Sequence, residues 1–351
     1  MDTIKVVHWG LGAMGSGIAK LVSSKTGLES IRAFDQDPNK HGRDLGDVSG
    51  IGRSLGVSVS EPPQKNWSIA GADLVIIATG SFTRQVFQQI EMAVNAGLNV
   101  ITIAEEMSFP AVKEPELAEK LDRLAREKGV SILGTGINPG FVLDTLAITL
   151  TGPCLNVDKI TATRINDLSP FGPTVMQTQG VGVTPEEFAA GLEAGTIVGH
   201  VGFPESIHII AGALGWQIDE IRQTREPILS SVRRETAHVT VEPGNVAGCR
   251  HTAQALSGGK VVIELIHPQQ VLPYLEGVET GDYIEIDGAP SISMKIQPEI
   301  PGGMGTMAMA VNMIPQVITA RPGLLNMSDL PIPAALMGDA AKLVKMRLGG
   351  R

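Results

Sequence analysis

The glycines near the start of the chain constrain the fold more than any other feature. The segment Gly10-Leu-Gly-Ala-Met-Gly15 follows directly after the apolar, β-branched run Ile4–Trp9, and helical spacing of apolar residues begins within it and continues to Ser23. A G-x-G-x-x-G pattern in this position needs a buried strand, a tight turn and a helix that starts at once. The sequence therefore predicts a strand–turn–helix unit at the N-terminus.

Strands and helices then alternate up to about residue 135. The apolar runs 30–34, 73–79, 99–103 and 130–133 are predicted strands, and residues 83–96 and 115–128 have helical spacing. Such alternation is typical of an α/β fold with a Rossmann-type, doubly wound parallel sheet.

After Gly140 the pattern changes to the alternation of half-buried strands. Strands are predicted at 159–166, around 238–242 and 254–256, and at 260–267, 283–286 and 291–296, with Gly258-Gly259 and Asp287-Gly288 as hairpin turns. Thr184-Pro-Glu-Glu187 is a capping box that starts a helix. These features predict an α+β domain with a largely antiparallel or mixed sheet.

Two apolar helices are predicted near the C-terminus, at 307–319 and 333–347. With 351 residues, the chain is long enough for two domains. We expect a dinucleotide-binding domain at 1–145, a substrate and dimerisation domain at 146–310, and a C-terminal helical segment at 311–351 of the kind that often returns to the first domain.

Composition excludes several classes of function. The net charge is −9 and no Lys/Arg block is present, so binding to nucleic acid or to an anionic membrane surface is not expected. No apolar stretch reaches the roughly 20 residues that span a bilayer. The two cysteines, Cys154 and Cys249, are expected to be buried thiols, and no group of residues has metal-ligand spacing. A cytoplasmic, metal-free protein is predicted.

The glycine segment predicts a dinucleotide site. Backbone N–H groups at the helix start face phosphates, and Asp35, at the end of the second strand, is placed to bind ribose hydroxyls. The loop Thr79-Gly80-Ser81 after the next strand is expected to flank the nicotinamide. The residues expected to bind the cofactor are Gly10, Leu11, Gly12, Ala13, Met14, Gly15, Asp35, Thr79, Gly80 and Ser81.

The charge of Asp35 sets the expected choice of dinucleotide. A carboxylate repels a 2′-phosphate, so NAD is favoured over NADP. Arg32, Lys40 and Arg43 lie close by in the sequence and leave NADP use open.

Two adjacent carboxylates, Glu105 and Glu106, follow the end of the strand at 99–103. This edge of an open α/β sheet lines the ligand crevice. Mutual repulsion and burial raise the pKa of at least one of the two, which suits a general base. The alternative is a solvated helix start.

Further candidates lie in the second half. Arg164 and Asn166 share one face of a strand and suit a carboxylate, although a surface ladder is the alternative. His267 ends another strand, and from its position alone a structural role is predicted. The glycine-rich segment 302–306 is able to offer N–H groups to an anion.

The sequence resembles the 2,4-diaminopentanoate dehydrogenases and the related native amine dehydrogenases over nearly its whole length. The resemblance is carried by the segments 9–15, Ala104-Glu-Glu-Met107, Gly134-Thr-Gly-Ile-Asn-Pro-Gly-Phe141, Arg164-Ile-Asn166, Gly199-His-Val-Gly-Phe203 and Ile266-His267. The first domain is also similar to that of dihydrodipicolinate reductase, but the catalytic His-His…Lys segment of that enzyme is missing.

The resemblance implies NAD(P)-dependent oxidation of the C4 amine of 2,4-diaminopentanoate to 2-amino-4-oxopentanoate and ammonia, with reductive amination as the reverse. It implies that Arg164, Asn166, His267 and Thr306 hold the amino-acid end of the substrate and that one glutamate is the base. Sugar oxidoreductases with a similar first domain use the second residue of Glu-Lys-Pro, which favours Glu106. Apolar residues such as Phe141 and Phe171 are expected to exclude water.

Two other readings remain open. The chain is alternatively an amine dehydrogenase acting on other amines, or a non-catalytic NAD(H) sensor. A homodimer is expected, because antiparallel sheets of this kind often pair.

Overall fold

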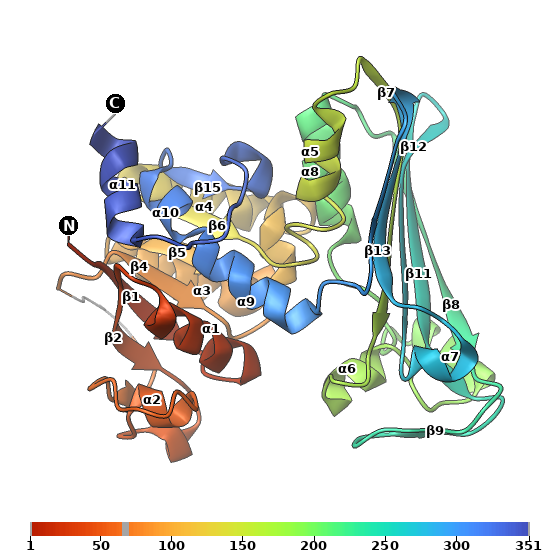
Figure 1. The fold of residues 1–351 in the computed structure, drawn as a ribbon, viewed down its shortest axis with the longest axis horizontal. Helices are drawn as coiled ribbons and strands as arrows, with labels where there is room; N and C mark the ends of the chain where they lie inside the picture. The colour runs from red at the N-terminus through yellow and green to blue at the C-terminus, as the bar shows by residue number, and fades with distance from the viewer. Residues whose placement is uncertain (1, 65–69, 350–351) are drawn as a thin grey trace. The chain divides into compact units, whose positions relative to one another are not determined.

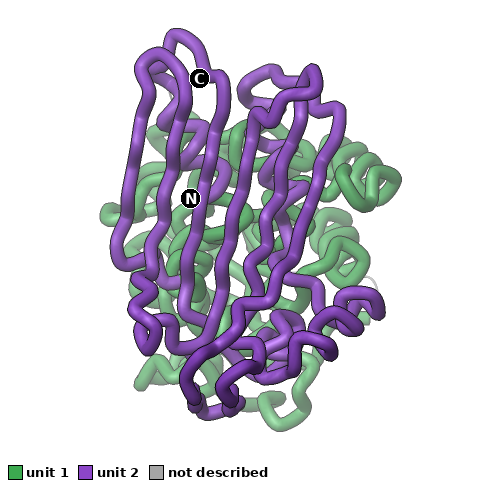
Figure 2. Tube along the Cα trace, turned by 90° about the vertical axis from the view of Figure 1, so that its right-hand side faces the viewer, with its two compact units in different colours: residues 1–141, 302–351 green, residues 142–301 purple. Residues whose placement is uncertain are grey.

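The computed structural model describes residues 2–64 and 70–349 and forms two compact units. The first consists of residues 1–141 and 302–351, and the second of residues 142–301 (Figure 2). The C-terminal segment from Gly302 therefore belongs to the first unit. Within the described ranges, no helix has the length and apolar character needed to cross a membrane.

The first unit is built on a seven-stranded sheet whose neighbouring strands all pair in parallel (Figure 1). The expected doubly wound sheet is confirmed. In spatial order its strands are β15 (Gly323–Leu325), β6 (Ser131–Gly134), β5 (Asn99–Thr102), β4 (Leu74–Ile77), β1 (Ile4–Trp9), β2 (Leu28–Phe34) and β3 (Val59–Ser60).

Helices cover both faces of this sheet. Alternate residues of the central strands pack against α1 (Ala13–Ser24), α9 (Gly302–Asn312), α10 (Ile314–Thr319) and α11 (Ala340–Gly349) on one face. On the other face they pack against α3 (Thr83–Asn95) and α4 (Pro115–Lys128). The short helix α2 (Leu45–Val48) and the 3-10 turns η1 (Pro38–Lys40), η2 (Glu105–Ser108), η3 (Pro110–Val112) and η5 (Met327–Asp329) complete the unit.

The C-terminal helices differ from the prediction. The single helix expected at 307–319 is two helices that meet at Met313, because Pro315 has no N–H group to continue the ladder. The glycine-rich segment before them is itself the start of α9, where Gly305 allows close packing against Ile137. The helix expected at 333–347 begins only at Ala340, after a proline- and glycine-containing stretch.

The second unit is built on a six-stranded mixed sheet. Its spatial order is β14 (Ile292–Ile296), β13 (Gly281–Ala289), β7 (Asn156–Asp167), β12 (Lys260–Gln270), β11 (Val246–Ser257) and β8 (Glu220–Leu229). Only the β7–β12 pair is parallel among the strands of this sheet. A small two-stranded sheet joins β9 (Arg234–Glu235) and β10 (Thr240–Val241).

One of the two predicted hairpin turns is wrong. Gly258-Gly259 joins β11 to β12, with both residues at positive φ. Asp287-Gly288 lies inside β13 at a register shift, and the chain reverses after Ala289. The pairing skips Asp158 on β7, and a Cβ on Gly288 would collide with the carbonyl oxygen of Asn156, so the close approach of the two strands requires a glycine here.

The helices of this unit are α5 (Thr145–Thr151), α6 (Pro173–Thr178), α7 (Pro185–Glu193) and α8 (Phe203–Leu214), with the 3-10 turn η4 (Pro273–Glu276). The capping box that starts α7 is confirmed. One face of the sheet is buried, whereas alternate residues on the other face, such as Thr161, Thr163 and Ile266, stay half-exposed. Figure 2 looks onto the six strands of this sheet.

Candidate active site

The glycine segment forms a turn into which side chains do not fit. Gly10 has a φ of +91°, and a Cβ there would lie 2.6 Å from the carbonyl oxygen of Ala78. A Cβ on Gly15 would collide with the carbonyl of Gly10. A Cβ on Gly12 would instead extend into open space, so this glycine keeps the backbone surface at the turn uncovered.

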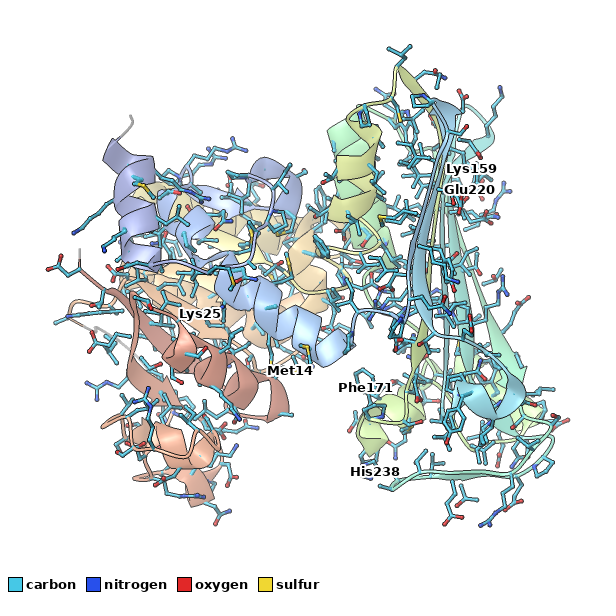
Figure 3. The ribbon with its side chains drawn as sticks, in the orientation of Figure 1. Met14, Lys25, Lys159, Phe171, Glu220 and His238 are labelled. Carbon is cyan, nitrogen blue, oxygen red and sulfur yellow. The ribbon has the colours of Figure 1, made fainter. Side chains whose placement is uncertain are left out.

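Helix α1 starts directly at this open surface. Its N-cap is Gly12, so no side chain caps the N–H groups of Ala13 and Met14, which begin its first turn (Figure 3 labels Met14). Uncapped N–H groups and the positive end of the helix dipole suit a diphosphate. The residues present therefore fit a dinucleotide.

Asp35 lies at the end of β2, beside this turn. Its carboxylate accepts hydrogen bonds from the backbone N–H groups of Leu11 (2.6 Å) and Asp37 (2.8 Å), and Lys40 Nζ lies 3.1 Å from Oδ2. Burial by itself raises the pKa of Asp35, but these two N–H groups and the Lys40 ammonium hold it below its ordinary value. The carboxylate is therefore ionised at neutral pH.

The loop after β4 is fixed by side chains of α3. Thr79 Oγ1 donates to Gln89 Oε1 (2.5 Å), and the N–H of Ser81 donates to Gln85 Oε1 (3.2 Å). A Cβ on Gly80 would lie 2.5 Å from Gln85 Oε1. The three predicted residues therefore form one ordered turn at the carboxyl end of a sheet strand.

The two glutamates of η2 differ in their surroundings. Glu106 Oε2 accepts a hydrogen bond from the N–H of Thr83 (2.8 Å), the first residue of α3, and its own N–H donates to the carbonyl of Ser81 (3.1 Å). Glu106 thus acts as an acceptor at the start of a helix, where negative charge is favourable.

Glu105 does not take part in this contact with the start of α3. Burial raises its pKa, a hydrogen bond with Ser81 opposes that effect, and the neighbouring charge of Glu106 raises the pKa further. The sequence predicts a raised pKa for at least one of the two glutamates, and in the structure that residue is Glu105.

Thr306 and Phe141 also belong to the first unit. Thr306 Oγ1, on α9, accepts a hydrogen bond from the N–H of Ile137 (3.2 Å). Phe141 is half-buried against the core that α1, α9 and α10 share. Both residues are therefore tied to the segment 134–141 that carries part of the resemblance.

Arg164 lies in the second unit and is buried. Nη1 is 2.5 Å from Asp282 Oδ1, and Nη2 donates to the carbonyl of Ile300 (2.6 Å), whose N–H in turn donates to Asp282 Oδ2 (2.9 Å). Its side chain is 2% exposed, so it is no surface ladder. Both terminal nitrogens are already bonded within the protein.

Asn166 and His267 lie on the same buried face as Arg164. Asn166 pairs in register with Gln269, and its Oδ1 is buried without a hydrogen-bond partner in the described part of the chain. Burial lowers the pKa of His267 well below its ordinary value, so its ring is neutral. Phe171, labelled in Figure 3, is half-buried beside α6 against Leu168 and Met176.

Sequence reasoning gave no role to two histidines on this face. His251 pairs in register with His267, and the His200 ring lies 4.9 Å from the His267 ring, centroid to centroid. His200 belongs to a segment that carries the resemblance, but nothing in its spacing indicated contact with His267. Among the residues that the structure describes, no cluster of metal-ligating side chains is found.

Comparison with known proteins gives a consistent result. The sequence model for the 2,4-diaminopentanoate dehydrogenase C-terminal domain matches residues 141–346, more than half of the chain. The chain is 46% identical to the 2,4-diaminopentanoate dehydrogenase of Acetoanaerobium sticklandii over 98% of both chains. It is 26% identical to an amine dehydrogenase of Streptomyces virginiae over 95% of this chain and 98% of the relative.

A solved structure agrees with these relatives. The amine dehydrogenase from Mycobacterium smegmatis superposes with a TM-score of 0.81 at 27% identity, over 94% of this chain and 97% of that one. The similarity therefore covers both units.

Proposed function

This chain belongs to the 2,4-diaminopentanoate dehydrogenase family, and we propose that it oxidises the C4 amine of 2,4-diaminopentanoate with a nicotinamide dinucleotide. The products are 2-amino-4-oxopentanoate, ammonia and the reduced dinucleotide, and the reverse reaction is a reductive amination. The identity over nearly the full length of the Acetoanaerobium enzyme carries this proposal.

The first unit supplies the dinucleotide site. The N–H groups that begin α1, above the open surface of Gly12, would hold the diphosphate, and Asp35 would bind the adenosine ribose. When bound, the nicotinamide ring accepts a hydride from the carbon that carries the amine. The turn Thr79–Ser81 would flank that ring.

We favour NAD, with some use of NADP. The ionised Asp35 opposes a 2′-phosphate. Lys40 lies 3.1 Å from the same carboxylate and partly neutralises it, so it offers a phosphate a cationic partner. The negative charge of Asp35 and the positive charge of Lys40 together support use of both NAD and NADP better than Asp35 alone would.

We assign the general base to Glu105 and not to Glu106, the residue favoured by the sequence. Glu106 is occupied as the acceptor at the start of α3, where its negative charge is stabilised. Burial raises the pKa of Glu105, and a base with a raised pKa works closer to neutral pH. We infer that Glu106 keeps η2 and α3 in place.

The proton transfers then follow from chemistry. The substrate ammonium must lose a proton before its carbon can release a hydride. Glu105 is the acceptor and passes this proton to solvent, so that it is ionised again for the next step. After hydride loss leaves an iminium ion, Glu105 takes a proton from the water that attacks it. The same carboxyl then donates this proton to the nitrogen and takes the proton of the new hydroxyl group, so that the C–N bond breaks, ammonia leaves and the ketone forms. Phe141 and Phe171 are the apolar side chains assigned to excluding bulk water.

The buried polar face of the second unit is assigned to the amino-acid end of the substrate. Asn166 has an unbonded acceptor, which suits an ammonium group. Arg164 is bonded through both terminal nitrogens to Asp282 and Ile300. We therefore propose that it mainly maintains the structure of this face and contributes a positive electrostatic potential there. His267 contributes a neutral ring, and Thr306 is assigned to the same end from the first unit.

We also propose a homodimer formed through the half-exposed face of the second sheet. Thr163 lies at its middle, between Ile266 on β12 and Tyr283 on β13. A flat face of threonine, isoleucine and aromatic side chains suits the same surface of a second copy. A cytoplasmic location stays a prediction, supported by the free thiols of Cys154 and Cys249.

An initial-rate screen tests the function. Formation of reduced dinucleotide is followed with 2,4-diaminopentanoate, with pentan-2-amine, which lacks both the carboxylate and the 2-amino group, and with other small amines, each with NAD and with NADP. We expect the highest kcat/KM for 2,4-diaminopentanoate. Higher efficiency with a simple amine would indicate a broader amine dehydrogenase, and no turnover with any amine would refute the proposal.

A further inference from the structure

The loop that precedes α8 is held by side chains at three successive residues. Arg225 Nε donates to the carbonyl of Val198 (2.7 Å), and Gln179 Nε2 donates to the carbonyl of Gly199 (2.8 Å). The N–H of His200 donates to His251 Nδ1 (3.1 Å). The three side chains come from β8, from the end of α6 and from β11, so the loop is fixed from separate parts of the unit.

Gly199 shows how closely the loop approaches the sheet. Its φ is +66°, and a Cβ there would lie 3.0 Å from His251 Nδ1. A side chain at this position would therefore be strained and would press on the imidazole that holds the next residue. The close approach is what lets the N–H of His200 reach His251.

The hydrogen bonds of His251 define its protonation. Nδ1 accepts the N–H of His200, so Nδ1 carries no proton, and Nε2–H donates to Gln223 Oε1 (3.0 Å). Burial and the charge of Arg225 lower the pKa of His251 to about 3. This ring is therefore a fixed, neutral acceptor at neutral pH, with no freedom to turn.

The loop presents the ring of His200 to the polar face. The ring meets Phe203 edge-on at 4.8 Å between centroids and contacts His267 at 4.9 Å. Its Nε2 is buried and has no hydrogen-bond partner among residues 2–64 and 70–349. Burial, His251 and Arg164 lower its pKa to about 3, so the ring is neutral. A buried imidazole nitrogen left unbonded is costly unless a ligand completes it.

We propose that His200 is a substrate-binding residue, whose Nε2–H donates to the carboxylate of the substrate, and that His251 is the positioning residue that sets it. This inference rests on the proposed function. A carboxylate is the chemistry that fits, because the positive charge of Arg164 acts on this ring and favours an anion beside it, and because an N–H donor forms a stronger hydrogen bond with an ionised acceptor.

The test compares four variants of the full-length enzyme. His200→Phe keeps a flat ring but removes the nitrogen. His251→Leu removes the acceptor for the loop, whereas His251→Asn places an amide oxygen where Nδ1 lies. His238→Gln is the matched control, because His238 is an exposed histidine in the turn between β9 and β10 (Figure 3). Thermal denaturation confirms that each variant is folded.

Three quantities are measured: kcat/KM for 2,4-diaminopentanoate, its Kd by calorimetry in the presence of the reduced dinucleotide, and the Kd of the dinucleotide itself. His200→Phe and His251→Leu should weaken Kd by roughly 10-fold to 150-fold, the range for a hydrogen bond to a charged group. His251→Asn and His238→Gln should stay within about threefold of the wild type, which is less than the effect of one such bond. The dinucleotide Kd should not change in any variant.

The outcomes separate the two proposals. A wild-type enzyme that neither binds nor oxidises 2,4-diaminopentanoate refutes the proposed function, and this inference with it. An active wild type with an unchanged Kd in His200→Phe refutes only the role of His200. If His251→Asn is as weak as His251→Leu, His251 serves packing and is not a positioning residue.

Discussion

Replacing Glu105 by glutamine is the sharpest test of the chemistry. The substitution keeps the size and planar shape of the side chain but removes its basic oxygen. General-base catalysis contributes about 10²-fold to 10⁴-fold, so kcat should fall by that factor, which corresponds to about 2.7–5.4 kcal/mol of barrier. Affinity for the dinucleotide should barely change, because Asp35 and the glycine turn are untouched.

The pH dependence gives an independent readout. Burial raises the pKa of Glu105 above its ordinary value, so the acidic limb of the kcat/KM profile, which reports the free enzyme, should lie above the range of a free carboxyl. Since the ionised form is the base, activity is lost as pH falls through that pKa. Glu105→Gln should abolish the limb. The two glutamates interact, so the limb of the wild type belongs to the pair.

Stability should change in the opposite sense to activity. A raised pKa in the folded state means that folding favours the protonated carboxyl. The stabilisation is present at low pH and is lost as pH rises through the raised pKa. Glu105→Gln should therefore be more resistant to urea than the wild type at neutral pH, and this advantage should disappear in acid.

Glu106→Gln is the matched control. Its amide oxygen is still able to accept the N–H of Thr83, so only the interaction of the charge with the start of α3 is lost, about 0.3–1 kcal/mol. Turnover should remain near normal. A large loss in Glu106→Gln, together with a nearly normal Glu105→Gln that keeps its acidic limb, would return the base to Glu106. Near-normal turnover in both variants would refute a carboxylate base.

Three further predictions follow from other parts of the molecule. Asp35→Ala should weaken NAD binding by about 1–3 kcal/mol and improve relative use of NADP, whereas Lys40→Ala should lower the NADP/NAD ratio of kcat/KM; unchanged ratios would remove both from cofactor selection. Arg164→Ala leaves Asp282 buried without its partner and should cost about 3–5 kcal/mol in urea denaturation, with similar losses of activity toward 2,4-diaminopentanoate and pentan-2-amine; a selective loss with the former would mean that Arg164 binds the amino-acid end directly. Thr163→Lys should yield monomers in light scattering, and an unchanged mass would place the dimer contact elsewhere.

The first unit was largely predictable because its signals are local. The central strands β1 and β4 are short and mostly apolar, and the glycine pattern defines where the first helix starts. The second unit was less predictable. Strand β8 alternates between half-exposed and exposed residues at the edge of its sheet, so it lacks the apolar face that marks a strand. Helix α8 begins after Gly202 without a side-chain cap, so it lacks the N-cap residue that marks a helix start in a sequence.

The different roles of Glu105 and Glu106 could not be predicted from the sequence. Sequence spacing places Glu105 and Glu106 together beyond β5, but adjacent residues of a 3-10 turn point in different directions. One glutamate accepts the N–H at the start of α3, and burial raises the pKa of the other. Which one does which depends on the position of Thr83, more than twenty residues earlier in the chain. Analogy with Glu-Lys-Pro selected the second residue, whereas the contacts of Glu106 favour the first.

The polar face of the second unit depends still more on distant partners. From the sequence Arg164 was either a carboxylate binder or part of a surface ladder, because Asp282 and Ile300 lie more than a hundred residues away. In the structure it is a buried, paired cation. Burial, together with its charge, lowers the pKa values of His200 and His267, so both rings are neutral. Neutral rings leave N–H donors that hold a carboxylate without competing for a proton. We therefore expect recognition of the amino-acid end to remain constant across neutral pH, while turnover follows the pKa of Glu105. A KM for 2,4-diaminopentanoate that follows a histidine titration would contradict this division.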